Sequence, residues 1–216
     1  MEILILANQT DLKKKVGKEP LLLHMLEEFK KNHNVSVFSK YSDVRSEVED
    51  SLLLPDIDLK TTLEKYKEGK ESFMVITKLV ISNIDYDKFK IYHDNHDKKC
   101  SIVLRNLVKG RTTPVYKLDE KKVVIDVNRK RYANCGIYIF DSTVDFSELK
   151  TLAALINDLM EAKELKAFIH AGYYEKNYEQ LKGIDYRNKE KEKIVEVVSE
   201  AIKENGKIKQ IMKENK

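Results

Sequence analysis

The chain has 216 residues, of which 42% are hydrophobic and 35% are charged, against about 25% charged in an average globular protein. This length suits one domain, or one domain followed by a helical tail. Forty Lys and Arg residues against 36 Asp and Glu leave a net charge of +4. The surface therefore mixes both signs and lacks the concentrated positive charge that a nucleic-acid backbone requires. An RNA-binding module would also need aromatic residues on a basic face, whereas the 11 Tyr and 7 Phe fall mostly inside the expected strands and helices.

Glycine and cysteine exclude further classes of protein. The seven glycines are scattered, so neither a Walker A loop nor a G-x-G-x-x-G loop is present. Cys100 and Cys135 are too far apart for a Cys-x-x-Cys zinc site, and we expect two ordinary buried thiols. Glu2 precedes a short apolar run that does not resemble a signal peptide. No apolar stretch approaches the roughly 20 residues that cross a bilayer. We expect a cytoplasmic protein that binds no membrane.

The first half of the chain alternates strands and helices. Residues 2–7 form a continuous apolar run, typical of a strand buried on both faces of a parallel sheet. Pro20 is expected to open a helix, because apolar residues follow it at helical spacing. The pattern then predicts a strand over 34–38, a polar helix that begins and is capped at Ser42, a short helix over 59–66 and a buried strand over 73–77.

The second half favours antiparallel strands. Short β-branched runs predict strands over 100–104, 114–118 and 123–127, the last two joined as a hairpin. A strand over 132–140, a helix over 152–160 and an edge strand over 166–170 follow. This order predicts an α/β fold: a Rossmann-like three-layer sandwich with a mostly parallel mixed sheet, strands 2–7 and 73–77 central and the hairpin at the periphery.

Residues 187–216 have a different character. They hold nine Lys or Arg and six Glu, with apolar residues at helical spacing. We expect two units, an α/β domain over 1–186 and a charged amphipathic helical tail over 187–216. The apolar stripe of a helix over about 188–204 is expected to pack on the domain or on another subunit, which would make a homo-oligomer or a hetero-oligomer.

Seven segments follow one another in an order that points to a family. They are Leu4–Ala7, Gly17–Leu22, Leu59–Leu63, Phe73–Ile81, Val115–Val124, Asn134–Phe140 and His170–Tyr174. Over about residues 2 to 182, this ordered set resembles the sugar nucleotidyltransferases, the nucleoside-diphosphate-sugar pyrophosphorylases. The resemblance implies a nucleotide-diphospho-sugar transferase-like fold. It also implies a reaction that joins a nucleoside triphosphate to a sugar 1-phosphate, with magnesium, and releases pyrophosphate.

The chain departs from that pattern where phosphate and metal would bind. The family's glycine-rich triphosphate loop is reduced to Asn8–Val16, which contains no glycine, and Lys60 stands where a glycine lets the nucleotide approach. The two metal-binding aspartates fall on Lys78 and Lys176. Magnesium prefers carboxylate oxygens and an ammonium repels it. We therefore expect no metal ligand and no cofactor, with magnesium required only if the chain is active.

The resemblance also suggests ligand-binding residues, but no catalytic ones. Positive charge survives near Arg129, and Asn134 matches the family's sugar-side asparagine. The predicted ligand-binding residues are Lys18, Thr61, Thr62, Lys78, Arg129, Asn134 and Lys176. Five of them have a structural alternative: Lys78 and Lys176 as solvated surface charges, Thr61 and Thr62 as the first turn of a helix, and Arg129 as part of an exposed turn.

Other polar patterns indicate no site. His93–Asp97 looks like a metal cluster but falls at a polar helix end before a strand, where histidine and aspartate are ordinary turn residues. The pairs Asp56 with Asp58 and Asp85 with Asp87 carry no mark of an acid and base.

Two hypotheses about function remain. In the first, the chain is a relative without the standard magnesium-dependent activity that binds a nucleotide or sugar phosphate, or only a protein partner, in a regulatory role. In the second, it is an active, divergent sugar-phosphate nucleotidyltransferase in which amines neutralise the phosphate charge. Dependence on magnesium distinguishes them.

Overall fold

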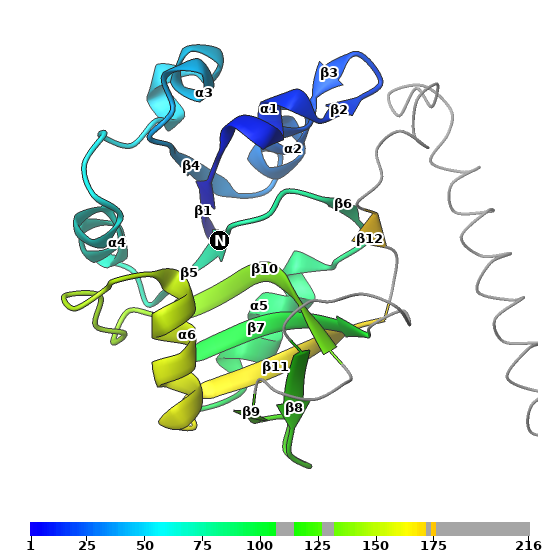
Figure 1. Ribbon diagram of the computed structural model, residues 1–216, viewed down its shortest axis with the longest axis vertical. Helices are drawn as coiled ribbons and strands as arrows, with labels where there is room; N and C mark the ends of the chain where they lie inside the picture. The colour runs from blue at the N-terminus through cyan, green and yellow to red at the C-terminus, as the bar shows by residue number, and fades with distance from the viewer. Residues whose placement is uncertain (107–114, 127–131, 172–173, 176–216) are drawn as a thin grey trace, which may run out of the picture.

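The computed structural model describes residues 1–106, 115–126, 132–171 and 174–175 (Figure 1). The main sheet has eight strands, six of which lie side by side: β1 Glu2–Leu6, β4 Asn34–Phe38, β5 Ser72–Ile76, β7 Cys100–Asn106, β10 Tyr132–Asp141 and β11 Leu165–His170. Their order across the sheet is β11, β7, β10, β5, β1, β4. β1 runs parallel to β4 and β5, and β11 runs parallel to β7, while β10 is antiparallel to both of its neighbours. The mostly parallel mixed sheet is confirmed.

Helices cover both faces of this sheet (Figure 1). α2 (Leu21–Lys30) and α5 (Tyr86–Asp94) pack on one face, and α4 (Leu59–Lys67) and α6 (Leu152–Glu161) pack on the other. Each face has its own cluster of buried apolar side chains. The predicted three-layer α/β sandwich is therefore confirmed.

The continuous apolar sequence of β1 follows from this layering. Ile3 and Ile5 belong to the cluster under α2 and α5, whereas Leu4 belongs to the cluster under α4 and α6, and all three are 0% exposed. Successive side chains of a strand point to opposite faces, so both sets must be apolar. Burying each such side chain contributes about 1.5 to 3 kcal/mol.

Helix starts differ in detail from the expectation. Pro20 is the residue before α2 and not its first residue. The polar helix α3 (Ser42–Glu47) begins at Ser42, but Tyr41 occupies the N-cap position and its side chain makes no capping hydrogen bond. The cap expected from Ser42 is therefore not formed.

Residues 9–20 are more regular than the expected loop. They form α1 (Gln9–Lys13) and a small hairpin of β2 (Lys15–Val16) and β3 (Glu19–Pro20). Gly17 makes the hairpin turn with φ of +62°, a conformation that glycine adopts at little cost. These elements rest on local hydrogen bonds and not on an apolar pattern, which explains why periodicity does not predict them.

The predicted hairpin consists of β8 (Val115–Leu118) and β9 (Val124–Asp126), paired antiparallel. β8 also pairs with β10. Near the hairpin turn, Ala167 N donates to Lys122 O at 2.9 Å, which attaches the turn to edge strand β11. A short 3-10 helix, η1 (Asp50–Leu52), and a small sheet of β6 (Ile81–Ser82) and β12 (Tyr174–Glu175) complete the described elements.

Neither cysteine forms a disulfide, and both are fully buried, as expected. Of the helices in the described residues, none has the length and apolar character needed to span a membrane. The predicted tail over 187–216 and the domain boundary before it lie outside the described residues.

Candidate functional site

The carboxyl ends of β1, β4 and β5 meet at one edge of the sheet, because the three strands are parallel. The chain passes from β1 to β4 on one side, then crosses to β5 on the other side of β1. Such a reversal of strand order opens a crevice beyond the carboxyl ends of the strands, where ligands of α/β proteins bind. This edge is therefore the candidate site.

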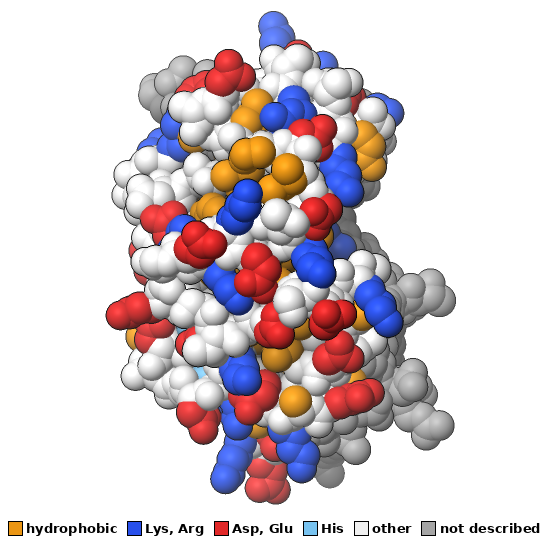
Figure 2. Space-filling model, turned by 90° about the vertical axis from the view of Figure 1, so that its left-hand side faces the viewer, with side chains coloured by type: hydrophobic (Ala, Val, Ile, Leu, Met, Phe, Trp, Pro, Cys, Tyr) orange, Lys and Arg blue, Asp and Glu red, His pale blue; other side chains and the backbone are white. Residues whose placement is uncertain are grey.

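A crevice of about 200 Å³ lies at this edge. Its lining residues come from the ends of β1 and β4, the residues that follow them and the start of α4: Leu6, Ala7, Phe38, Ser39, Lys40, Tyr41 and Leu59. Tyr41 is 44% exposed, one of two large hydrophobic residues with high exposure in the described chain. Figure 2 views the molecule from the side of α3 and α4, where hydrophobic side chains form a group among charges of both signs. The crevice is mainly apolar, with Lys40 at its margin.

The end of β5 is tied to β10 at Gly136. Thr77 follows β5, and its backbone N–H and its hydroxyl both donate to Gly136 O, at 2.8 and 3.1 Å. Gly136 has φ of +76° and lies in a β-bulge, where the register between β10 and β7 shifts. A Cβ atom at Gly136 would meet Thr77 Oγ1 at 2.7 Å and Lys78 Cγ at 2.9 Å. Glycine is therefore required for Lys78 to hold this place at the edge of the sheet.

Asn134 lies on the other side of Gly136. Its Oδ1 accepts a hydrogen bond from Gly136 N at 2.7 Å, and its Nδ2 donates to Tyr138 Oη at 2.6 Å. The bulge therefore brings together two predicted ligand residues, Lys78 and Asn134, that come from different strands. The ammonium-bearing Lys78 side chain is exposed and Asn134 is half-buried.

The segment after β1 folds on itself. Asn8 N donates to Asp11 Oδ2 at 3.0 Å, and Asn8 Oδ1 accepts from Thr10 N at 2.9 Å, which together form a capping box for α1. Asp11 N also donates to Asn8 O. These amides are engaged within the segment, so they do not present the open cradle of N–H donors that holds a triphosphate.

Asp11 is an unusual group in this segment, because it is a carboxyl only 1% exposed. Burial raises its pKa, while the hydrogen bond from Asn8 and the charge of Lys14, 3.8 Å away, oppose that shift. Sequence reasoning did not single out Asp11. The N-x-x-D spacing before a helix is the signal that could have revealed its capping role.

Thr61 and Thr62 lie in the first turn of α4. Thr61 donates to the carboxylate of Asp58 from its N–H at 2.9 Å and from its hydroxyl at 2.6 Å, and these hydrogen bonds lower the pKa of Asp58. The hydroxyl of Thr62, which is buried, donates to Asp58 O at 2.9 Å. Both hydroxyl protons are therefore used in starting the helix, and a role of the two threonines in binding stays a prediction.

The other predicted ligand residues are dispersed. Lys18 is exposed in the turn of the β2–β3 hairpin. Arg129 and Lys176 lie outside the described residues. Of the seven predicted residues, Lys78 and Asn134 share a neighbour in the described chain. Lys78 packs against Gly136, and Asn134 accepts a hydrogen bond from its N–H.

The resemblance implies a metal position at Lys78, and the ammonium of a lysine does not fit magnesium. Within the described chain, no group of three or more His, Cys, Asp or Glu side chains is arranged to hold a metal ion. Asp58 and Asp85 instead serve as N-caps of α4 and α5, with pKa values lowered by hydrogen bonds from Thr61 and Lys88.

No protein-family model matches the sequence, and no curated protein matches it. Solved structures do match. A protein described as a glucose-1-phosphate thymidylyltransferase of Bacillus anthracis, in complex with sucrose, is similar with a TM-score of 0.62 and 16% identity, over 86% of this chain and 96% of that one. HddC from Yersinia pseudotuberculosis is similar with a TM-score of 0.57 and 16% identity, over 80% and 92%. HddC complexed with GMP-PN gives 0.58 and 15%, over 81% and 92%.

These similarities establish the fold. The chain has the architecture of sugar nucleotidyltransferase structures over most of its length. At 15 to 16% identity they say nothing about activity.

Proposed function

We propose that this chain is a ligand-binding relative of the sugar nucleotidyltransferases that lacks magnesium-dependent nucleotidyl transfer. It binds a nucleotide or a sugar phosphate at the carboxyl edge of β1, β4 and β5 and acts in a regulatory role. The observation that carries this proposal is Lys78, an exposed ammonium whose stem lies against Gly136 at the position that the resemblance assigns to a metal-binding aspartate.

The crevice suits the apolar part of such a ligand. Leu6, Phe38 and Leu59 offer apolar contact to a base, and the exposed ring of Tyr41 can stack on it. HddC, which has a similar fold, was solved with GMP-PN, which supports a nucleotide as the ligand class here.

Lys78 supplies the charge for the phosphate. An ammonium forms charge-assisted hydrogen bonds with phosphate oxygens and does so without a metal. The backbone N–H groups after β1 are already hydrogen-bonded in the capping box. They are therefore not available to bind the phosphates of a triphosphate. The site therefore favours a monophosphate or a sugar phosphate over a triphosphate–magnesium complex.

Titration calorimetry with GMP and with glucose 1-phosphate, in EDTA and then in magnesium, tests the proposal. We expect binding in EDTA, and a loss of about tenfold in affinity in Lys78→Ala, the cost of one charge-assisted hydrogen bond. Lys121→Ala, an exposed lysine in the β8–β9 turn, is the matched control and should bind as the wild type does.

An assay of pyrophosphate release decides between the two functions. We expect no turnover with nucleoside triphosphates and sugar 1-phosphates. Turnover on the order of 1 per second or faster that stops on chelation would show an active transferase with a rebuilt site.

A further inference from the structure

A second groove, of about 400 Å³, lies at the opposite edge of the sheet. Its lining comes from the start of β5, the end of α5 with the segment after it, and the end of β10. Lys78 follows the other end of β5. The groove is therefore separate from the candidate site.

Polar residues of three strands gather beneath the end of α5. Ser72 of β5 pairs with Asp141 of β10, and Ser101 of β7 pairs with Ile139 of β10. Ile139 belongs to the apolar cluster under α5. Because side chains alternate between faces along a strand, Ser72, Asp141 and Ser101 all lie on the face that α5 covers.

The fully buried Ser101 links two imidazoles of the His93–Asp97 segment. Its Oγ lies 2.9 Å from His93 Nδ1 and 2.8 Å from His96 Nε2. Lys98 N donates to His96 Nδ1 at 3.1 Å, so the proton of His96 is on Nε2 and is donated to Ser101. In the arrangement that continues this hydrogen-bond chain, Ser101 donates its own proton to His93 Nδ1, and His93 carries its proton on Nε2.

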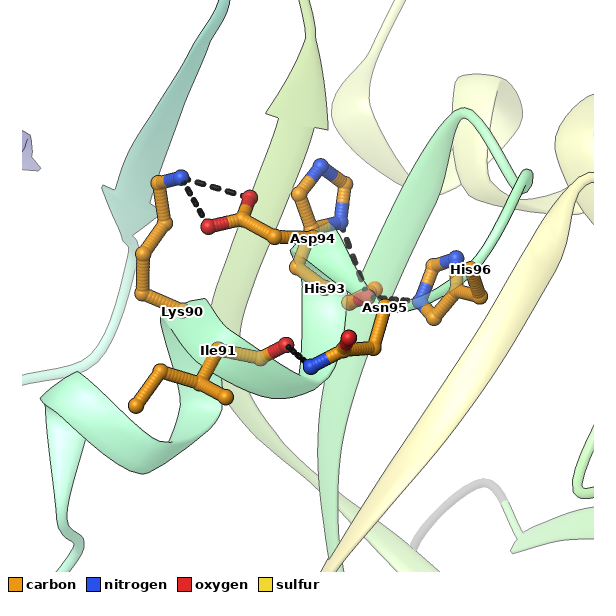
Figure 3. A network of polar contacts seen from close by, with 7 residues as sticks. Lys90, Ile91, His93, Asp94, Asn95 and His96 are labelled. Carbon is orange, nitrogen blue, oxygen red and sulfur yellow. Dashed lines mark hydrogen bonds and ion pairs between the residues drawn. The ribbon is translucent and has the colours of Figure 1, made fainter.

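His93 therefore presents a neutral donor. It is 5% exposed, and burial followed by the charge of His96 lowers its pKa to about 4. Figure 3 shows the second ring nitrogen of His93 pointing away from the hydrogen-bonded one, with no interaction to any residue drawn. Since His93 lines the groove, this N–H is directed to a ligand or to solvent.

The groove offers both donors and acceptors. Ser72 Oγ is buried and has no hydrogen-bond partner among the described residues. Glu71 and Asp141 contribute carboxylates, and Asp141 Oδ1 accepts from a backbone N–H at 2.7 Å, which orients it.

Charge narrows the class of ligand. The carboxylates in the lining are Glu71, Asp94, Asp97 and Asp141, and the ammonium groups are Lys98 and Lys99. Lys90 neutralises Asp94 at 2.5 and 2.6 Å (Figure 3). Lys98 pairs with Asp97 at 3.8 Å, which leaves Glu71 and Asp141 against Lys99, an excess of one negative charge that disfavours a phosphate. A protonated amine has no acceptor for His93 Nε2–H, whereas a hydroxyl both donates and accepts.

We propose that this groove binds a small polyhydroxylated ligand, such as a free sugar, with His93 and Ser72 as donors and Glu71 and Asp141 as acceptors. The site is independent of the phosphate site at the other edge. It gives the protein a means to bind an unphosphorylated sugar while a phosphorylated ligand is bound elsewhere.

NMR titration of the isotope-labelled full chain with D-glucose tests this proposal, up to about 50 mM, where a ligand with a Kd of about 1 mM is nearly saturated. We expect shifts at Ser72, His93 Nε2, Asp141 and Thr143, and none at Lys78 or Asn134. Ser72→Ala and Asp141→Asn should each weaken the apparent affinity about 3-fold to 10-fold, the loss of one hydrogen bond. Lys78→Ala should leave it unchanged.

Three outcomes would overturn the proposal. In the first, glucose does not change the chemical shifts of the groove residues in the folded wild type. In the second, inorganic phosphate or putrescine changes these shifts more than glucose does. In the third, both groove variants bind glucose with the affinity of the wild type. The dispersion of the backbone amide signals shows whether each variant is folded.

Discussion

Gly136 packs directly against Lys78, since a Cβ atom on the glycine would lie 2.9 Å from Lys78 Cγ and 3.0 Å from Lys78 Cβ. The same glycine accepts two hydrogen bonds from Thr77 and donates one to Asn134. One residue without a side chain thus joins the end of β5 to the bulge of β10. The position of Lys78 depends on it.

Gly136→Ala should therefore destabilise the protein by about 2 to 4 kcal/mol, adding the strain of a left-handed backbone to the cost of overpacking. Urea denaturation measures this loss. Gly69→Ala is the matched control, because Gly69 also has positive φ, +71°, but nothing within 4 Å of the added Cβ. It should cost only about 1 to 2 kcal/mol. Equal losses in the two variants would show that the contact with Thr77 and Lys78 is unimportant.

Charge reversal at Lys78 should make the binding of GMP depend on magnesium. In Lys78→Asp we expect GMP to bind at least about tenfold more weakly in EDTA, because a carboxylate replaces the partner of the phosphate. Magnesium should restore part of the affinity, since the new carboxylate can coordinate it. Titration calorimetry of Lys121→Asp, with the same change in net charge, is the control. Unchanged binding in Lys78→Asp would exclude Lys78 from the site.

The stability should fall in acid through His93. Its pKa is about 4 in the folded protein, below its ordinary value of 6.5, so the unfolded chain takes up a proton between these values that the folded chain does not. Stability is therefore retained above pH 6.5 and declines from there to about pH 4, by about 3 kcal/mol in total. The lowered pKa of His96 adds a loss of the same sign. Denaturation at several pH values measures the profile.

His93→Gln should flatten that profile, because glutamine does not titrate, and His33→Gln should keep it because the network of His93, His96 and Ser101 stays intact. The lowered pKa values of Asp58 and Asp85 act below pH 3.8, outside this window. A slope in His93→Gln as steep as in the wild type would refute the role of His93.

Asp11 should tolerate asparagine but not alanine. Burial raises its pKa, so the folded state loses stability as the pH rises from 3.8 through the raised value and the carboxyl ionises. Asp11→Asn removes that buried charge and keeps an acceptor for Asn8 N, so at pH 7 it should be at least as stable as the wild type. Asp11→Ala leaves that N–H without its acceptor and should lose about 1 to 3 kcal/mol. Thermal unfolding compares the two, and the reverse ranking would contradict this account.

The apolar patterns were enough to predict the layers of the fold. The continuous apolar sequences of β1 and β5 predict that both faces of these strands are buried, and the apolar side of α2 predicts that one face of the helix is buried. These patterns can be read from the sequence because side-chain periodicity is a local property of each element. Elements held by local hydrogen bonds were not predicted. Asp58 and Asp85 carry no mark of an acid and base in the sequence, and in the structure they are N-caps.

The α/β class, the central strands and the peripheral hairpin follow from the amino-acid pattern, since burial at a period of two or of 3.6 residues depends only on neighbours along the chain. The contacts of Lys78 and Asn134 with Gly136, and the hydrogen bonds of Ser101 with His93 and His96, come instead from the packing of strands that are far apart in the chain. These contacts depend on the register of β10 against β5 and β7 and on the bulge within it. A shift of one residue would turn every side chain to the other face, and register is set by the packing of the whole sheet.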